Sequence, residues 1–588
     1  MEKGNISVNT ENIFPVIKKW LYSDQDIFIR ELVSNCADAI SKHRSLVQSG
    51  DAPAVDEKPK IRVILNKTDR TLAFDDNGIG MTADEVRKYI NQIAFSGAEE
   101  FLRKYEGSDE KNTIIGHFGL GFYSAFMVSE QVTIDTLSYQ DGATPVHWVC
   151  DGSTEYELTD GTRDGNGTRV TLTIAEDANE FLEADTIRAT LDKYCGFLPY
   201  EIYFEDGETD EPRPLNDTEP LWNKKPSECT RDEYLSFYHK LFADLSDPLF
   251  WIHLNVEYPF RLKGILYFPK LKHQFESSEG QIKLYNNQVF VADNIREVIP
   301  EFLLLLKGVI DCPDLPLNVS RSFLQNDGTV RRMSAHITKK VADRLTGLYN
   351  TEREQFEEYW EDIAPFVKYG CMRDEKFLEK VENILLVKTV KGEYTTFVSA
   401  TEGKDKIFYA SDEKGQATYL DQFAKQGKEA LILDSFIDPH FTSFWEMKHP
   451  SIRFARIDSE LAESGSVIEN AELLGWFTEA VNDEKIAVSL QELSDPDLPA
   501  IVLLSEQSRR MLEMGISFGM ADAAEKFPEQ LTLVINTKNP LIGKITADNY
   551  KTYCPHVFDL AMLAHRPLSA EKMGIFLKRS YEILNGSI

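Results

Sequence analysis

The stretch Arg30-Glu-Leu-Val-Ser-Asn-Cys-Ala-Asp-Ala-Ile40 places three polar side chains, Glu31, Asn35 and Asp38, at positions i, i+4 and i+7. On an α-helix, which turns by about 100° per residue, this spacing puts them on one narrow stripe. The opposite stripe is small and apolar enough to pack against a sheet, and it consists of Val33, Cys36, Ala37 and Ile40. The sequence therefore predicts a helix that directs an acid and an amide toward one place.

A second motif is Asp75-Asp-Asn-Gly-Ile-Gly-Met-Thr82. Asn-Gly is a common turn dipeptide, so Asp76 can be an ordinary turn residue. The functional alternative is a buried carboxylate that accepts the exocyclic amine of adenine, with the missing side chains of Gly78 and Gly80 admitting the flat ring. Guanine carries an oxygen at that position, so the motif favours adenine.

A glycine-rich stretch, Gly116-His-Phe-Gly-Leu-Gly-Phe-Tyr-Ser124, precedes an apolar helical start. Glycine lets backbone N–H groups face phosphates, and a helix N-terminus adds its dipole. A Rossmann fingerprint would need this cluster directly after a strand, with an acid about 20 residues further on. Residues 111–115 form a poor strand, and Asp135 lies inside its own β-type run. The sequence also contains no G-x-x-x-x-G-K-[ST], which excludes a P-loop.

The stretch Gly167-Thr168-Arg169 opens a predicted strand. The hydroxyl of Thr168 can hydrogen-bond to Asp76 or to water around a base, although taken alone it is an ordinary strand residue.

Composition bounds the class of protein. The 588 residues include 96 acidic and 64 basic ones, a net charge of −32, which argues against nucleic acid or an anionic membrane as partner. Seven scattered cysteines without a C-x-x-C pair fit neither a zinc site nor a disulfide framework, and so favour a reducing compartment. The start resembles no signal or transit peptide, and the longest apolar run, 302–306, is too short to span a bilayer. We expect a cytoplasmic protein.

The chain is long enough for three or four domains. An acidic, proline-rich stretch at 205–220 reads as a linker or exposed loop. A weaker boundary at 462–466 precedes the last part. We therefore expect domains at 1–210, 221–465 and 466–588, each mixing helices with strands.

The order and spacing of these motifs along the chain are more informative than any single motif. A helix with Glu and Asn, then Asp-x-Gly-x-Gly, a glycine-rich loop and Gly-Thr together resemble the gyrase, histidine-kinase and MutL ATPase superfamily. The resemblance implies an α/β sandwich for the N-terminal ATP-binding domain.

The chain resembles the heat-shock protein 90 chaperones, in their bacterial form, and the second region decides this within the superfamily. The similarity is carried by Phe28-Ile-Arg-Glu-Leu-Val-Ser-Asn35, Asp247-Pro-Leu-Phe-Trp-Ile-His253, Ile282-Lys-Leu-Tyr-Asn-Asn-Gln-Val-Phe290 and 307–325. It is strong over about 1–330, looser to 465 and weak beyond. It implies an ATP-hydrolysing chaperone with an α/β middle domain and an α+β C-terminal dimerisation domain. Its partners would be unfolded or partly folded clients and a second copy of the chain, with no nucleic acid and no membrane.

Residue roles follow from the resemblance. Glu31 would be the general base, and Asn35 would hold Mg²⁺ against the phosphates of ATP. Arg321 would reach the γ-phosphate from the middle domain, with Asn318 and Gln325 in the same loop. Asp38 would only support its neighbours. The remaining contacts to the nucleotide would come from Asp76, Gly80, Met81, Gly119, Gly121, Phe122 and Thr168.

The expected lid, over 91–116, departs from the family pattern. It begins Ile90-Asn-Gln-Ile-Ala-Phe-Ser-Gly-Ala98, so that Phe95 replaces an expected lysine and Asn91 replaces a hinge glycine. A cationic contact to the nucleotide is lost, and the affinity and closing rate are expected to differ.

Three alternatives remain. A DNA-repair or topology ATPase of the same superfamily needs DNA contact, which the net charge opposes. A histidine kinase needs a phosphoacceptor helix, and only about 20 residues precede the first long helix. A non-catalytic scaffold that merely binds ATP would be distinguished by measuring phosphate release.

Overall fold

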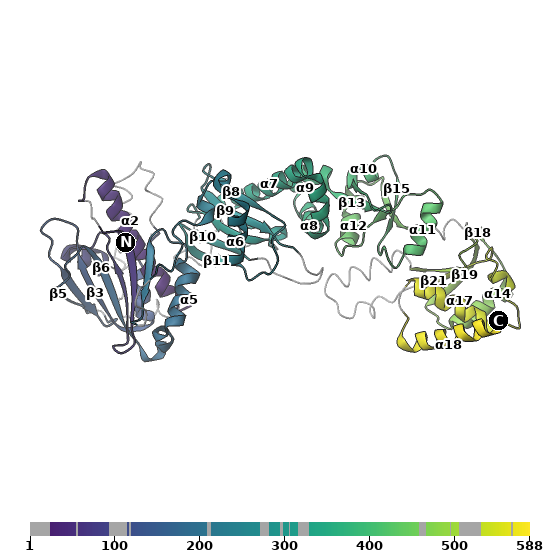
Figure 1. Cartoon of the computed structure of the whole chain (residues 1–588), viewed down its shortest axis with the longest axis horizontal. Helices are drawn as coiled ribbons and strands as arrows, with labels where there is room; N and C mark the ends of the chain where they lie inside the picture. Colours follow the sequence, from purple (N-terminus) through teal and green to yellow (C-terminus); the bar gives the residue numbers. More distant parts are fainter. Residues whose placement is uncertain are drawn as a thin grey trace, which may run out of the picture. The chain divides into compact units, whose positions relative to one another are not determined.

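The computed structural model describes residues 24–53, 57–92, 115–116, 119–153, 155–207, 213–270, 281–293, 298–304, 306–315, 328–457, 466–493, 495–504, 531–565 and 568–587. The chain divides into two compact units, and the division falls between Lys340 and Val341. Each unit is described by itself. The fold is α/β, as the sequence predicts, and its element order can be followed in Figure 1.

A seven-stranded sheet forms the first part of the first unit, in the order β5-β4-β3-β6-β2-β1-β7. All neighbouring strands are antiparallel except β1 and β7, which are parallel. Alternate residues of β1 are buried, as expected for a sheet covered by helices on one face. The strands are β1 (Lys60–Asn66), β2 (Thr71–Asp76), β3 (Ser129–Leu137), β4 (Val146–Cys150), β5 (Glu157–Asp160), β6 (Gly167–Ile174) and β7 (Glu201–Glu205).

The helix α2 (Ile27–Ser49) lies across this sheet and is the central element of the site (Figure 1). It packs on β2 and on the short helix η4 (Gly121–Met127), and it contacts α5 (Ala184–Cys195). Its apolar stripe is buried as predicted, and the helix ends at Gly50 with a left-handed φ of 81°. Two shorter helices complete this part, α3 (Ala83–Tyr89) and η5 (Glu176–Leu182).

A five-stranded sheet, β11-β10-β12-β9-β8, forms the second part of the first unit. Aromatic contacts join it to the end of α5, since the rings of Phe197 and Trp222 lie 4.7 Å apart and those of Phe197 and Tyr285 lie 5.6 Å apart. The elements are η6 (Leu221–Asn223), η7 (Pro226–Glu228), α6 (Arg231–Leu241), β8 (Phe250–Val256), β9 (Leu262–Phe268), β10 (Ile282–Asn286), β11 (Val289–Asp293), η8 (Glu301–Leu303) and β12 (Lys307–Asp311). The helix α7 (Gly328–Thr351) begins in this unit and contains the division between the two units.

The predicted linker at 205–220 is more ordered than its composition indicates. The side chain of Asn216 accepts from the N–H of Ile202 at 2.8 Å and donates to the carbonyls of Leu198 and Tyr200 at 2.7 and 2.8 Å. These hydrogen bonds fix the end of the segment beside β7, so its described part is packed against the sheet. The predicted domain boundaries near 210 and 466 adjoin 208–212 and 458–465, which lie outside the described residues.

The second unit contains two further sheets, β14-β13-β16-β15-β17 and β18-β19-β21-β20. A buried ion pair between Lys368 and Asp438 joins α8 to α12. The helices are α8 (Arg353–Arg373), α9 (Glu375–Val381), η9 (Glu382–Ile384), α10 (Phe397–Thr401), α11 (Ala417–Lys425), α12 (Asp438–Lys448), α14 (Ala471–Val481), η10 (Ile542–Lys544), α17 (Tyr550–His565) and α18 (Ala570–Ser587). The strands are β13 (Leu386–Thr389), β14 (Tyr394–Thr396), β15 (Lys406–Ala410), β16 (Leu431–Ile432), β17 (Arg453–Arg456), β18 (Ser466–Val467), β19 (Ile486–Glu492), β20 (Ala500–Leu504) and β21 (Leu531–Asn536).

Within the described ranges, no helix is both long enough and apolar enough to cross a membrane.

Candidate nucleotide site

The carboxylate of Glu31 lies on the buried side of α2, facing the start of η4. Only 4% of the residue is exposed, and a Cβ placed on Gly121 would lie 2.5 Å from its Oε2 atom. Any side chain at 121 would therefore displace the carboxylate. The glycine-rich segment and the predicted base are in direct contact, as the sequence pattern requires.

Arg30 holds the other oxygen of this carboxylate. Its Nε and Nη2 atoms donate to Oε1 of Glu31 at 3.0 and 2.9 Å, and both side chains are almost fully buried. A buried carboxylate needs such a partner, because an uncompensated charge away from water is very costly. Sequence reasoning missed Arg30, although its position next to Glu31 was a signal that a compensating cation lies nearby.

Asp38 has a larger part than the sequence suggested. Its two carboxylate oxygens accept the N–H groups of Ile115 and Gly116, each at 2.7 Å. The exposed Asn35 points the same way, since its Oδ1 would be 3.7 Å from a Cβ on Gly116. One helical turn thus fixes the start of the glycine-rich segment, and the i, i+7 spacing of Glu31 and Asp38 matches the two ends of that segment.

Asp76 ends β2 and is buried, with 5% of the residue exposed. Its Oδ1 atom accepts the N–H of Gly78 at 2.8 Å. Burial raises the pKa of its carboxyl to about 7, while the N–H of Gly78 and the charge of Arg163 lower it. This acid therefore changes charge close to neutral pH.

The two glycines after Asp76 make room for the protein itself. A Cβ on Gly78 would lie 2.5 Å from the carbonyl carbon of Ala39 in α2, and one on Gly80 would lie 1.8 Å from the carbonyl oxygen of Leu137 in β3. Gly80 also has a left-handed φ of 60°. Close backbone packing thus gives its own reason for glycine at both positions, and the interpretation that their missing side chains admit a flat ring stays a prediction.

Thr168 and Met81 belong to one hydrogen-bond network. The hydroxyls of Thr168 and Thr136 are 2.9 Å apart, and the Thr136 oxygen accepts the N–H of Met81 at 2.9 Å. Thr168 pairs with Asp76 in the β2–β6 ladder. The structure therefore brings Asp76, Met81 and Thr168 together, as predicted, and adds Thr136, which the sequence motif does not mark.

Aromatic packing holds Phe122 and the base of the predicted lid. The ring of Phe122 lies edge-on to Trp148 at 5.9 Å, and the Trp148 indole N–H donates to the side-chain oxygen of Asn91 at 3.0 Å. Tyr123 donates its hydroxyl to the carbonyl of Ile90 at 2.5 Å. Gly119 takes a left-handed φ of 61° just before this segment. The side chain of Asn91 is therefore hydrogen-bonded to β4, a contact that a glycine at this position could not make.

The predicted residues Arg321, Asn318 and Gln325 lie in 316–327, and Phe95 lies in 93–114; both segments are outside the described residues. Where the structure is described, no group of three or more His, Cys, Asp or Glu side chains could hold a metal ion.

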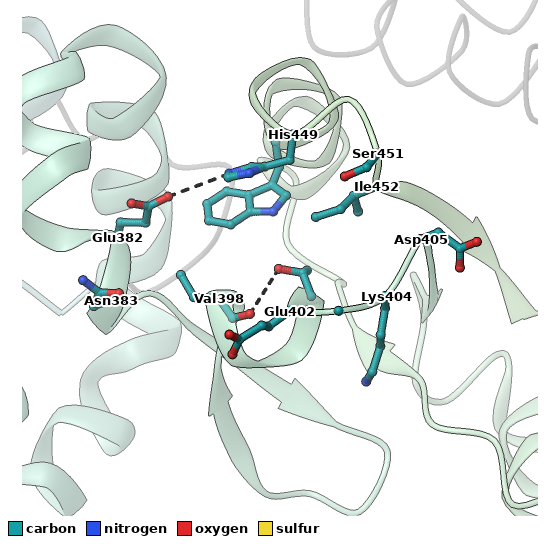
Figure 2. Close-up of a pocket in the computed structure, with 12 residues that line it drawn as sticks. Glu382, Asn383, Val398, Glu402, Lys404, Asp405, His449, Ser451 and Ile452 are labelled. Atoms are coloured by element: carbon teal, nitrogen blue, oxygen red, sulfur yellow. Dashed lines mark hydrogen bonds and ion pairs between the residues drawn. The ribbon is translucent and has the colours of Figure 1, made fainter.

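A cavity of about 470 Å³ lies in the second unit, between η9, the end of α10 and the end of α12 (Figure 2). Its lining includes the carboxylates of Glu382, Glu402 and Asp405. Its lysine, Lys404, pairs with Glu429 at 3.1 Å. This acidic lining repels phosphate groups, so the cavity has the wrong charge for a nucleotide.

Comparison with known proteins agrees with this arrangement. Residues 23–157, which include α2, Asp76 and Gly121, match the family model of histidine kinase-, DNA gyrase B- and HSP90-like ATPases. Residues 205–547 match the model of the Hsp90 protein family, which covers more than half of the chain. The chain belongs to the Hsp90 family.

Relatives of this Hsp90-family chain span nearly its whole length. It is 43% identical to the chaperone protein HtpG of Porphyromonas gingivalis, over 95% of the chain and 86% of that protein. The identity to HtpG of Bacteroides thetaiotaomicron is also 43% over the same shares, and that to HtpG of Idiomarina loihiensis is 30% over 96% of both. The chain is therefore an ATPase and an ATP-dependent molecular chaperone.

The anchoring role of Asp38 can be tested by removing its carboxylate. In Asp38→Ala the N–H groups of Ile115 and Gly116 lose their acceptors, at about 1–3 kcal/mol for each buried group. We expect hydrogen exchange at these two amides to accelerate about tenfold to a hundredfold. Asp38→Asn, which keeps one acceptor oxygen, should fall between.

The matched control is Asp177→Ala, at an exposed position of η5. Unchanged protection of both amides in Asp38→Ala would show that the segment is held by other contacts.

Proposed function

We propose that this Hsp90-family chain hydrolyses ATP on the face of α2 and uses the energy for a dimer clamp cycle that assists the folding or maturation of clients. The observation that carries the proposal is the convergence of α2 on the glycine-rich segment. Glu31 lies against Gly121, while Asn35 and Asp38 lie against Gly116. Three polar groups one and two turns apart on one helix thus follow the path that a polyphosphate would take.

Asp76 is the proposed reader of adenine. Its ionised carboxylate accepts the exocyclic amine, and Met81 and Thr168 lie beside it in the network described above; Gly80 is proposed to contact the ring as well. Guanine would present an oxygen to the same carboxylate and be repelled. The burial of Asp76 supports this role, because a hydrogen bond to a charged group is strongest where water is excluded.

Asn35 is the proposed ligand of Mg²⁺. Its amide oxygen is a hard donor on an exposed side chain, which suits an ion that keeps several waters and takes few protein ligands. When bound, Mg²⁺ neutralises charge on the phosphates. The N–H groups around Gly119 and Gly121, with Phe122, complete the proposed phosphate side of the site.

Glu31 is the proposed general base. In this structure Arg30 holds one of its oxygens, so orienting a water requires that the other oxygen face the phosphates. Arg321 is proposed to complete the site from the middle domain, 221–465, with Asn318 and Gln325 in its loop. Hydrolysis then requires the N-terminal domain, 1–210, and the middle domain to dock, so closure of the lid over 91–116 rather than chemistry limits turnover.

The last domain, 466–588, is proposed to join two chains. On α18 the side chains of Leu577, Tyr581 and Leu584 follow an i, i+4, i+7 spacing and are 43%, 62% and 61% exposed. An exposed apolar stripe of this kind marks a surface that a partner covers. The proposed partners are a second copy and unfolded or partly folded clients in the cytoplasm, with no role for nucleic acid or membrane.

The assignment of the base predicts a separation of binding from hydrolysis. Glu31→Ala should bind ATP with near-normal affinity and release phosphate about a hundredfold to ten-thousandfold more slowly, because general-base catalysis contributes on that order. Calorimetry and single-turnover phosphate release measure the two quantities. Normal turnover would refute the role of Glu31, and an absence of phosphate release in the unmodified chain would identify a non-catalytic scaffold.

The assignment of Asp76 predicts pH-dependent binding. Its carboxyl has a pKa raised to about 7 and must be ionised to accept the amine, so protons compete with the nucleotide as the pH falls. We expect the Kd of ADP to rise about fourfold from pH 8.5 to pH 6.5. Calorimetry over that range, with Asp76→Asn as the variant expected to lose binding, tests it. A flat profile would contradict the role.

The dimer surface can be tested by charge. In the full-length chain, Leu577→Glu combined with Leu584→Glu should halve the molecular mass in solution measured by light scattering. The reason is that the introduced carboxylates of one chain would meet the same introduced carboxylates of the second chain and repel them. The matched control is Leu245→Glu, at a leucine that is 95% exposed in the first unit. A dimeric mass in the double variant would place the interface elsewhere.

A further inference from the structure

An ionic cluster lies behind the adenine-reading residue, on the side of β2 away from α2. The Asp75 carboxylate is largely buried and receives Arg163 at 2.8 Å on one oxygen and Arg169 at 2.8 Å on the other. Arg62 lies at 3.6 Å from the second oxygen. The side chains of neighbouring residues in a strand point to opposite faces, so the Asp75 and Asp76 carboxylates lie on opposite sides of the end of β2.

Arg163 differs from the other two arginines in what else it holds. Its Nη2 atom donates to the main-chain carbonyl of Asp76 at 2.8 Å, and its Nε atom donates to the carbonyl of Gly165 at 3.0 Å. Arg62 instead directs its fork to Glu205, with two bonds of 2.7 Å. Arg163 thus ties together the Asp75 side chain, the Asp76 backbone and its own loop.

That loop, between β5 and β6, and the first residue of β6 pack on the backbone of 76–78 at two further points. The side-chain amide of Asn166 donates to the carbonyl of Gly78 at 2.8 Å. A Cβ on Gly167, whose φ is 120°, would lie 2.1 Å from the carbonyl oxygen of Asp76. The loop therefore supports the backbone of 76–78 directly, with Arg163 as its charged contact.

We propose that Arg163 is a positioning residue for nucleotide recognition: it fixes the end of β2 and holds a positive charge beside Asp76, the residue proposed to meet the adenine amine. The inference rests on the proposed role of Asp76. It adds a residue from a loop that contains none of the predicted site residues.

The electrostatics around Asp76 favour this role. The groups that influence its charge are the Cys36 thiol on α2, the Asp75 carboxylate on β2, the Arg163 guanidinium, and the N–H groups of Gly78 and Thr168. Burial and Asp75 raise the pKa of Asp76, whereas Arg163 and the two N–H groups lower it. Arg163 acts twice, because it attracts the Asp76 charge and also neutralises the neighbouring Asp75.

Removal of Arg163 has a signature that loss of structure would not give. Without the cation the pKa of Asp76 rises, so the ionised fraction falls at neutral pH but not at high pH. Because the pKa of Asp76 is already raised to about 7, a further rise lowers the ionised fraction at pH 7 and changes it little well above that pH. The affinity for ADP then falls about fivefold at pH 7 and stays nearly unchanged at pH 9.

The experiment compares Arg163→Gln with Arg169→Gln in the full-length chain, by calorimetry with ADP from pH 6.5 to pH 9. Arg169→Gln is the matched control, because it also removes a 2.8 Å ion pair with Asp75 but comes from a partly exposed side chain on β6. We expect Arg163→Gln to bind more weakly at pH 7 and to recover at pH 9, and Arg169→Gln to stay within about twofold throughout.

Two results would overturn the proposal: unchanged affinity in Arg163→Gln, or a weakening that is equal at every pH. Arg163→Lys retains the charge without the fork, so it should keep the pH profile of the unmodified chain even if Arg163→Gln folds poorly. Asp76→Asn distinguishes failure of the proposed role of Asp76 from failure of the proposed role of Arg163. If that variant binds ADP normally, the proposed role of Asp76 fails, whatever Arg163 does.

Discussion

Two hydrogen bonds to one buried carboxylate join the two halves of the candidate site. Asp38 accepts the N–H groups of Ile115 and Gly116, and charge-assisted bonds of this kind are roughly twice as strong as neutral ones. They fix the start of the glycine-rich segment on α2, and the segment then reaches Glu31 at Gly121. This anchor adds to the packing of α2 on η4, which already brings the predicted base to the predicted phosphate loop.

The same helix shows what such a site requires of the fold. Arg30, Glu31 and Asp38 are all buried in α2, where apolar side chains would pack at no electrostatic cost. Arg30 compensates Glu31, and two N–H groups compensate Asp38. The second unit obeys the same rule at the Lys368–Asp438 pair between α8 and α12. The buried carboxylates of α2 thus occur at the positions where the proposed ATP hydrolysis needs a carboxylate.

The local sequence pattern predicted α2 and the strands around it, because the periodicity of polar and apolar residues can be recognised within one continuous segment. The helical stripe of Glu31, Asn35 and Asp38 and the family resemblance were both visible in the sequence. Thr136 and Arg163 were not, because their contacts with the Asp76 turn depend on which distant loop folds back onto it. The packing reason for Gly78 and Gly80 was hidden for the same cause, because their neighbours, Ala39 and Leu137, are far away in sequence.

The contact between Gly121 and Glu31 also restricts how this sequence can change over evolutionary time. A single methyl group at 121 would lie 2.5 Å from the carboxylate, so a side chain there requires the carboxylate of Glu31 to move. Substitutions at 121 and at 31 are therefore expected to depend on each other. A homologue that has lost the acid would release the constraint, and its position 121 would then be free to take larger residues.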